Sequence, residues 1–133
     1  MKAIDTNILV RFLVRDDEKQ AGLVYRRFKS AEAKKEALFV PLLVVLETIW
    51  VLESVYNEHR NAILDSLNDL ILMPVFQFEK PDVIQASIAS SRQTSLGIAD
   101  LLIAYSAKNA GCESVLTFDE KAAKSGLFEL LKG

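Results

Sequence analysis

The sequence is poor in the side chains that bind zinc or act as the base in nucleophilic hydrolysis. Its 133 residues include one cysteine, Cys112, and one histidine, His59. A single thiol cannot close an intrachain disulfide, which favours a reducing, cytoplasmic location. One cysteine and one histidine cannot supply a standard zinc site. Serine and cysteine hydrolase schemes would both depend on His59, whose polar surroundings instead predict the start of a helix.

Long apolar runs are also missing. The most apolar stretch, residues 37–52, contains Pro41 and Glu47. It falls short of the roughly 20 residues that a membrane-spanning helix needs. The N-terminal residues show no apolar core followed by a small-residue cleavage site, as a secretory signal would. We therefore expect no association with a membrane.

A strong excess of basic charge is absent as well. Lysine and arginine total 16 against 18 aspartates and glutamates, which gives a formal net charge of −2. The sequence thus lacks the footprint of a protein that holds nucleic acid by phosphate neutralisation alone. A nucleic-acid enzyme stays open, because acids concentrated in one metal site would mask a basic rim elsewhere.

The residues that are present suffice for one hydrophobic core. Apolar residues make up 50% and charged residues 26% of the chain, which is the profile of a globular protein. No internal repeat, low-complexity segment or Gly/Ser/Pro linker interrupts it. We therefore expect a single domain that spans residues 1–133.

Short apolar runs alternate with longer stretches at helical spacing. The expected strands are 2–5, 38–40, 74–78, 114–117 and 128–131. The expected helices are 6–14, 17–33, 42–56, 57–72, 81–94, 99–110 and 120–124. This alternation predicts an α/β fold with a mostly parallel sheet and helices on both faces. Strands covered on both sides should be continuously apolar, as Leu38 to Val40 and Val115 to Leu116 are.

The apolar spacing also predicts which helix faces are covered. In helix 17–33 one face is charged, and Leu23, Val24 and Phe28 should point inward. Helix 42–56 is so apolar that most of its circumference should be covered. With helix 57–72 it carries more apolar surface than one sheet layer covers. The surplus predicts either an interface with another protein or ordinary core.

Several acids fall where parallel strands end. Asp5 closes the first strand, Glu47 lies about two turns into the helix after the second, and Asp119 follows strand 114–117. Because ligands of such folds bind beyond the carboxyl ends of the strands, we expect these acids near one edge of the sheet. Asp100 opens a helix, and spacing alone does not place it. Clustered carboxylates suit Mg²⁺ or Mn²⁺, the ions of phosphoryl-transfer chemistry.

Each acid also has a structural interpretation. Asp5 fits a helix cap, and Asp100 suits the dipole of the helix it opens. Asp119 fits a first-turn acid beside a capping-box pattern of Thr117 and Glu120. Glu47 differs, because almost every neighbour favours burial, and a buried unpaired carboxylate costs several kcal/mol. A metal or a cation would remove that cost. The alternative is a glutamate that reaches solvent from a partly exposed strip.

At this point the sequence resembles a known family, the PIN domains, and in particular the small VapC-like toxins. Asp5-Thr6-Asn7 after a short strand looks like the opening motif of that family. Glu47, the run from Ala99 to Ala104, and Thr117-Phe118-Asp119 are similar to its remaining acidic positions, in the same order. The resemblance implies a three-layer α/β/α fold with a mostly parallel sheet. It also implies an endoribonuclease that depends on Mg²⁺ or Mn²⁺, acts commonly as a homodimer, and is inhibited by a small antitoxin protein.

Carried over residue by residue, the resemblance makes Asp5, Glu47, Asp100 and Asp119 metal ligands, directly or through water. Asn7 and Thr117 would orient carboxylates or water. One departure is the pair Gly97-Ile98 before Ala99, where an aromatic or aspartate is more usual. Arg11 and Arg15, four residues apart on the first expected helix, would share a face and could hold RNA phosphates. The alternative is a solvated face paired with Asp16 and Glu18.

Two other functions fit part of the pattern. A Mg²⁺-dependent phosphatase of the haloacid-dehalogenase type also opens with an aspartate after its first strand, but it needs a second aspartate two residues on, where Asn7 stands. A PIN-like fold that has lost activity would serve as a binding module, and the complete set of acids argues against it. The RNA target, the cleavage sequence, the number of metals, and cleavage of DNA are open.

Overall fold

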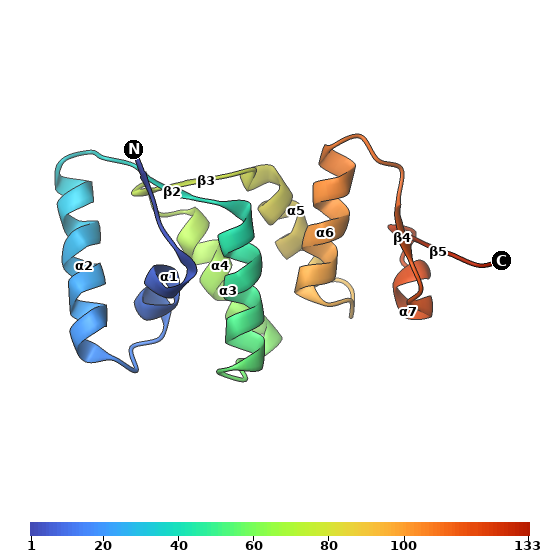
Figure 1. The fold of residues 1–133 in the computed structure, drawn as a ribbon, viewed down its shortest axis with the longest axis horizontal. Coiled ribbons are helices and arrows are strands. Elements are labelled where there is room, and N and C mark those ends of the chain that lie inside the picture. Colours follow the sequence, from blue (N-terminus) through green and yellow to red (C-terminus); the bar gives the residue numbers. More distant parts are fainter. The chain divides into compact units, whose positions relative to one another are not determined.

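The computed structural model describes residues 1–133, which form two compact units, Met1–Pro81 and Asp82–Gly133 (Figure 1). Helices and strands alternate along both units, as the apolar pattern predicts. None of the helices combines the length and the apolar character that crossing a membrane requires.

The first unit contains a three-stranded parallel sheet. Its strands are β1 (Lys2–Ala3), β2 (Leu38–Val40) and β3 (Phe76–Phe78), in the order β1-β2-β3. Backbone hydrogen bonds extend the pairing beyond the strands: Ile4 N donates to Phe39 O at 3.0 Å. Since all three strands run in one direction, their carboxyl ends lie at the same edge of the sheet.

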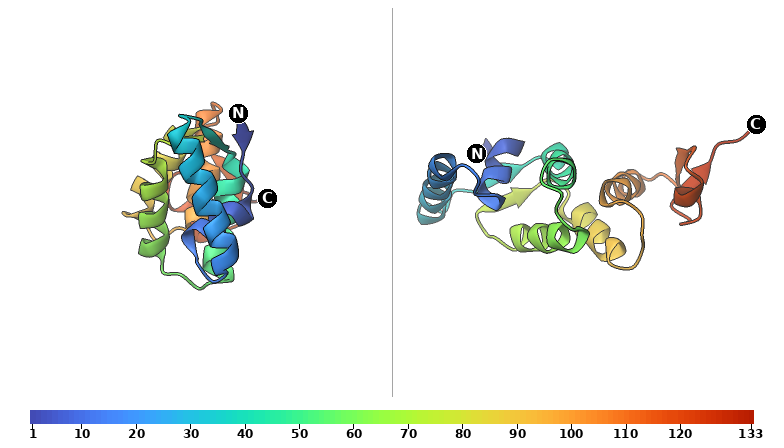
Figure 2. Two further views of the ribbon diagram at one scale, coloured as in Figure 1. Left: turned by 90° about the vertical axis from the view of Figure 1, so that its left-hand side faces the viewer. Right: turned by 90° about the horizontal axis from the view of Figure 1, so that it is seen from below.

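Four helices surround this sheet, namely α1 (Thr6–Leu13), α2 (Glu18–Ala33), α3 (Leu42–Ser54) and α4 (Arg60–Ile71). Helix α1 packs against both α2 and α3, and α4 packs against β3. In the right-hand view of Figure 2, α1 and α3 lie on one side of the strands and α4 on the other. The α1–α3 contact matters for the site, because both helices start at the carboxyl edge of the sheet.

Aromatic and aliphatic side chains fill the space between sheet and helices. Phe28 of α2 meets Phe12 and Phe76 edge to face, with ring centroids 5.0 and 5.1 Å apart. Phe76 meets Phe78 in the same manner at 5.9 Å. One apolar stripe of α4 is buried, with Ile63, Leu64, Leu67 and Leu70 at most 3% exposed. Edge-to-face pairs of this kind add about 0.5–1.5 kcal/mol beyond the burial of area.

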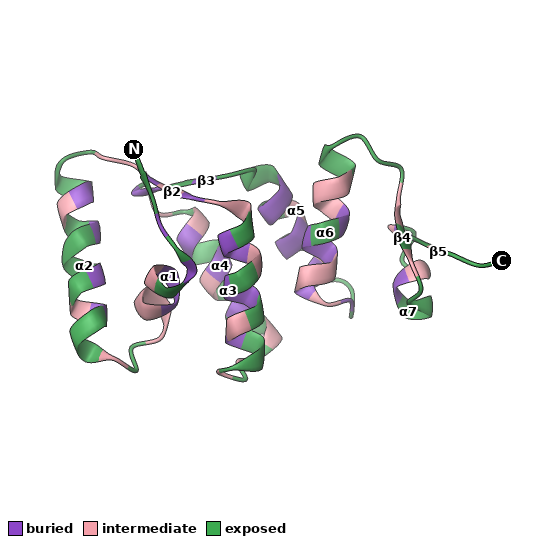
Figure 3. Cartoon of the chain, in the orientation of Figure 1, coloured by how far each residue is buried: buried purple, intermediate pink, exposed green.

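The expectation that most of α3 would be covered is wrong. Val45, Ile49 and Leu52 are at most 1% exposed, whereas Leu43 is 77% and Trp50 59% exposed. Figure 3 shows buried and exposed stripes along this helix. The apolar composition of the helix concealed this division, because apolar residues also occupy its exposed stripe.

The expectation for α2 is wrong at one position. Val24 and Phe28 are buried as predicted, but Leu23 is 55% exposed. The buried stripe of α2 also includes Ala21 and Ala31, so it follows helical spacing three and four residues at a time. Leu23 lies off that stripe, and small alanines occupy the inward positions instead.

The helix predicted from residue 57 begins three residues later, at Arg60. Asn57 has a positive φ of 52°, which turns the chain after α3 and cannot continue a helix. His59 occupies the N-cap position of α4 in extended conformation and is exposed. The polar stretch around His59 therefore starts a helix, as expected, but the turn before it takes up more residues.

The second unit contains α5 (Pro81–Ser91), α6 (Ile98–Asn109), β4 (Val115–Thr117), α7 (Glu120–Ala123) and β5 (Phe128–Leu130). Strands β4 and β5 pair in parallel, with Val115 opposite Phe128. A small core of Leu96, Leu101, Ala104, Ala122 and Phe128 joins α6 to α7 and β5. Leu116, expected to be covered, is 64% exposed because β4 and β5 form a two-stranded sheet with an open face there.

Candidate active site

One pocket of the first unit lies where the sequence predicts the site. Its volume is about 280 Å³, and its lining includes Asp5, Asn7, Arg11, Glu47 and Tyr56. These residues come from the end of the first strand, from α1, and from α3 and the turn after it. The sheet brings Asp5 and Glu47 together although they are far apart in the sequence. Glu47 lies 41 residues after Thr6, the residue that follows Asp5.

Asp5 has the structural role that its position predicts and keeps an oxygen to spare. It is the N-cap of α1, and its Oδ1 accepts a hydrogen bond from the backbone amide of Thr6 at 2.7 Å. Its backbone carbonyl accepts from Leu9 N at 3.4 Å. The cap fixes the orientation of the carboxylate, and Oδ2 forms no hydrogen bond.

Glu47 is exposed, so the expectation of a buried, unpaired carboxylate is wrong. It lies on the stripe of α3 that also carries the exposed Leu43 and Trp50, four residues before and three residues after it. Residues so spaced share a face, and this face points away from the core. Glu47 therefore reaches solvent from a partly exposed strip of α3, where its carboxylate is accessible from the pocket.

Thr6 holds Glu47 in place, a contact that sequence reasoning missed. The Thr6 hydroxyl donates a short hydrogen bond to Oε1 of Glu47, and Thr6 itself is only 7% exposed. The signal was the middle residue of Asp5-Thr6-Asn7, whose side chain faces α3 while those of Asp5 and Asn7 are exposed. Thr6 therefore connects the start of α1 to the acid on α3.

Arg11 lies at the rim of the same pocket in a network of side chains. Its Nε donates to Gln20 at 2.7 Å, and its Nη1 lies 3.2 Å from both Asp16 Oδ1 and the Tyr56 hydroxyl. Tyr56 in turn donates to Asp16 Oδ2 at 2.9 Å. The hydrogen bond to Tyr56 and the charge of Asp16 raise the pKa of Arg11. The alternative of a solvated face paired with Asp16 and Glu18 therefore holds for Arg11 and Asp16, whereas Glu18 forms no ion pair.

Arg15 does not share a helix face with Arg11, contrary to the prediction. Helix α1 ends at Leu13, and Val14 caps it in extended conformation. The spacing of four residues therefore has no helical meaning here. Arg15 is exposed in the loop that leads to α2.

In the second unit, Asp119 is an N-cap like Asp5. Its Oδ1 accepts from the backbone amides of Lys121 at 2.9 Å and Ala122 at 3.2 Å. The Thr117 hydroxyl accepts from the amide of Asp119 at 3.0 Å, which orders the turn after β4. The capping box expected of Thr117 and Glu120 is wrong, because Asp119 itself caps α7.

Asp100 lies in the first turn of α6, three residues after the N-cap Gly97. Its carboxylate folds back over that glycine: a Cβ built on Gly97 would stand 3.1 Å from Oδ2 of Asp100. The Cβ atoms of folded proteins rarely lie so close to another side-chain atom. The departure noted at Gly97 thus has a local reason, since glycine leaves room for the carboxylate.

The structure brings Asp5 and Glu47 together in the first unit, and it places Asp100 and Asp119 in the second. No group of three or more His, Cys, Asp or Glu side chains that could hold a metal ion is formed. Asp5 and Glu47 offer only oxygen atoms, and oxygen is the donor that Mg²⁺ and Mn²⁺ prefer. The chemistry of this pair therefore fits a hard divalent cation.

Comparison with known proteins agrees with the expected fold. The chain is 29% identical over 126 residues to a VapC ribonuclease of Aquifex aeolicus (strain VF5), covering 95% of this chain and 93% of that protein. The family model of the PIN domain matches residues 2–126. Since this match spans nearly the whole chain, and the strands pair in parallel between helices as expected, the protein belongs to the PIN domain family.

Proposed function

We propose that this PIN domain protein is an endoribonuclease that depends on Mg²⁺ or Mn²⁺ and hydrolyses RNA phosphodiester bonds. The observation that carries the proposal is the pocket in which Asp5 and Glu47 meet, with Thr6 bonded to Glu47. The similarity to a protein named VapC ribonuclease supports RNA as the substrate.

We further propose that residues 1–133 act as one domain in which Asp100 and Asp119 complete the metal site. In this proposal all four acids bind the ion, directly or through water. Changing Asp5 or Asp119 to asparagine would remove a ligand charge but keep the helix cap, since asparagine caps helices as well as aspartate does. Thr117 orders the Asp119 turn. Asn7 lines the pocket beside Asp5 and would orient a carboxylate or a water molecule.

The chain's own residues would have distinct tasks. A divalent ion held by Asp5, Glu47, Asp100 and Asp119 would supply Lewis-acid polarisation of the phosphate and would neutralise charge on the leaving oxygen. Asp5 is oriented by its cap, and Thr6 fixes one oxygen of Glu47, so both carboxylates are preorganised before substrate binds. Arg11 stands charged at the rim and would hold a flanking phosphate. The attacking group is water, so the chain needs no nucleophilic side chain.

We also propose that the protein is a cytoplasmic toxin, inhibited by a cognate antitoxin protein, and that it acts as a homodimer. The support is the similarity to a VapC protein, together with apolar residues left exposed on and beside α3. Leu43, Trp50 and Val55 are each more than half exposed. Apolar surface of this kind is commonly covered by another protein.

The test is cleavage of total cellular RNA by the purified protein, with the new 5′ ends mapped. We expect discrete cuts with Mn²⁺, none with EDTA, and none from the Asp100→Asn variant. The matched control is Asp82→Asn, because Asp82 also lies in the first turn of a helix of the second unit. That variant should cut like the parent.

Cuts that survive EDTA or the Asp100→Asn change would mark a contaminating nuclease and contradict the proposal. Absence of cuts in RNA, with metal-dependent cuts in single-stranded DNA, would make the protein a DNA nuclease. Absence of any cleavage would favour the alternative of an inactive PIN-like binding module.

A further inference from the structure

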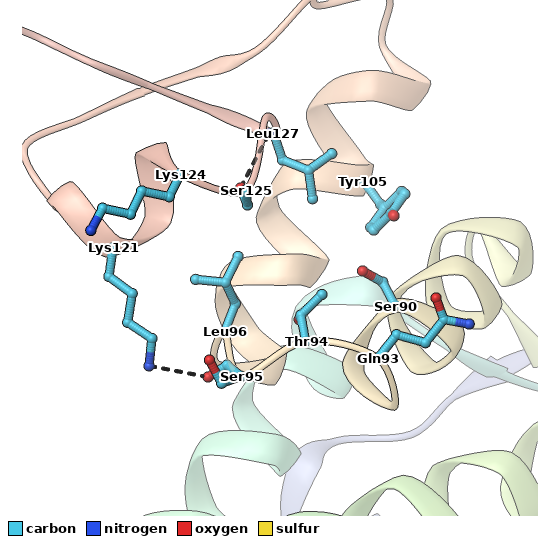
Figure 4. Close-up of a pocket in the computed structure, with 10 residues that line it drawn as sticks. All are labelled: Ser90, Gln93, Thr94, Ser95, Leu96, Tyr105, Lys121, Lys124, Ser125 and Leu127. Carbon is cyan, nitrogen blue, oxygen red and sulfur yellow. Dashed lines mark hydrogen bonds between the residues drawn. The ribbon is translucent and has the colours of Figure 1, made fainter.

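A second cavity, in the second unit, is distinct from the pocket of Asp5 and Glu47. Its volume is about 550 Å³, within the usual range for pockets that bind small organic ligands. Residues of the loop between α5 and α6, of α6, and of the α7 region line it (Figure 4). Nothing in the proposed chemistry uses this cavity.

Positive charge gathers at one side of the cavity. Lys121 and Lys124 are three residues apart, in and at the end of α7, and both line it. Neither lysine forms an ion pair. The Lys121 Nζ reaches the carbonyl oxygen of Ser95 at 3.5 Å, a weak hydrogen bond that leaves its other protons free for an anion. An anionic group is the natural partner for two uncompensated ammonium groups.

The other side of the cavity is aromatic and polar rather than charged. In Figure 4, Tyr105, Ser90 and Gln93 lie opposite the two lysines, with Leu96 between the groups. Tyr105 is half-buried and packs on the core of this unit, so its ring is held in place. The Gln93 amide and the Ser90 hydroxyl each offer both donors and acceptors.

We propose that this cavity binds one nucleotide of the single-stranded RNA substrate, with a phosphate at Lys121 and Lys124 and a base against Tyr105. The proposal rests on the proposed ribonuclease function and names a substrate contact for it. Charge at one end and an aromatic ring at the other match a nucleotide, because bases stack on aromatic side chains and phosphates pair with lysine. An acidic peptide would use the lysines but would have no need of the aromatic end.

The location of the cavity supports the proposal. Lys121 follows Asp119 on the same short helix, and the amide of Lys121 donates to the Asp119 carboxylate. Ser95 precedes Asp100 by five residues, at the loop that leads into α6. A strand bound in the cavity would therefore pass close to the parts of the second unit that carry its proposed metal ligands.

The first measurement is binding of a fluorescein-labelled, mixed-sequence RNA of 20 nucleotides to the full-length protein in EDTA, so that cleavage does not interfere. We expect the double variant Lys121→Ala/Lys124→Ala to bind at least tenfold more weakly. The slope of log affinity against log salt should fall by roughly 0.7, the value for one lost phosphate contact on a single strand. The control is Lys19→Ala/Lys34→Ala, which removes the same charge from the first unit and should bind like the parent.

The aromatic end is tested separately. Tyr105→Leu should weaken binding about fivefold or more because stacking is lost, whereas Tyr105→Phe keeps the ring and should bind nearly as the parent does. Thermal unfolding of each variant checks that the core around Tyr105 persists. RNA carrying 4-thiouridine, photocrosslinked to the parent protein, should label the tryptic peptide 93–108, which contains Tyr105.

The inference would be overturned if the Lys121→Ala/Lys124→Ala variant bound and cleaved RNA as the parent does, or if crosslinks were confined to the first unit. Either result would leave the proposed ribonuclease function standing. Unchanged RNA binding combined with loss of binding to a poly-glutamate peptide would assign the cavity to an acidic protein instead. Failure of the parent itself to bind or cut RNA would overturn the proposed function, and this inference with it.

Discussion

Asp5 and Asp119 each cap a helix through one carboxylate oxygen, Oδ1. The structural and the catalytic interpretations of these residues are therefore compatible, because capping uses one oxygen and leaves the other. The cap also holds the side chain in one orientation, which a metal ligand needs. An aspartate at the end of a parallel strand thus serves the helix that follows and remains available to an ion.

Thr6 allows the sharpest prediction at a single residue. Thr6→Val keeps the shape but removes the hydroxyl that donates to Glu47. We expect RNA cleavage to fall about 10- to 100-fold, the usual loss when a residue that orients a metal ligand is removed. Thr6→Ser keeps the hydroxyl and should retain most of the activity. Rates measured over a range of Mn²⁺ concentrations check this, and equal rates for Val and Ser would contradict it.

Gly97 makes a second residue-level prediction. In Gly97→Ala the new Cβ would crowd Asp100 Oδ2, so the carboxylate must shift by a few tenths of an ångström. The backbone there has φ −58°, which alanine adopts without strain, so stability should change little. We expect a weaker apparent affinity for Mn²⁺ in the cleavage assay and an almost unchanged melting temperature. A large loss of stability with normal metal dependence would show that Asp100 is not involved.

The apolar pattern predicted the bounds of helices and strands well where a proline or a glycine ends the element. Strand β2 has the predicted bounds because Pro41 ends it and begins the next helix. The stretch after α6 turns at Gly111, whose φ of 95° suits glycine. The start of α4 was missed, because a positive φ at Asn57 leaves no clear signal in a polar stretch.

The sequence predicted that Asp5 and Glu47 would lie together, and they line one pocket, but Asp119 follows a strand of a different sheet and the contacts around the acids were missed. Asp5 and Glu47 could be brought together from sequence, because parallel strands present their ends at one edge. The exposure of Glu47 could not, because burial depends on which stripe of an all-apolar helix faces the core. Tyr56 and Asp16, which both contact Arg11, are hydrogen-bonded to each other although they are 40 residues apart in the sequence. No local sequence pattern predicts this contact.

A pH prediction belongs to the junction between α2 and β2. Arg27 Nη2 lies 2.6 Å from Glu36 Oε1, and this hydrogen bond and the arginine charge lower the pKa of Glu36. A lowered pKa in the folded state gives stability that is present above the unfolded value of about 4.3 and is lost as pH falls below it. The pair is exposed to solvent, so the effect should be small.

Urea unfolding at pH 7, 5, 4 and 3 checks this prediction. Between pH 5 and pH 3 the midpoint of the Glu36→Gln variant should fall less than that of the parent, because the variant has no such proton to take up. Glu113→Gln, an exposed glutamate elsewhere, should follow the parent. Parallel midpoints for Glu36→Gln and the parent would show that the ion pair contributes nothing measurable.

Thermal unfolding with and without metal tests whether both units serve one metal site. If one ion is bound by acids from both, it stabilises the folded chain by about 2.7 kcal/mol when its concentration is 100 times the dissociation constant. For a chain of this length that corresponds to a melting temperature higher by about 10 °C. We expect Mn²⁺ to produce such a rise and EDTA to reverse it.

Substitutions then test the contribution of each unit to metal binding separately. Asp5→Asn in the first unit and Asp119→Asn in the second should each abolish the rise, although both variants keep their helix caps and should melt near the parent without metal. Asp82→Asn should keep the full rise. A rise that disappears in Asp5→Asn but persists in Asp119→Asn would assign the ion to the pocket of Asp5 and Glu47 alone. The second unit would then contribute substrate contacts rather than ligands, because its lysines would still face the RNA.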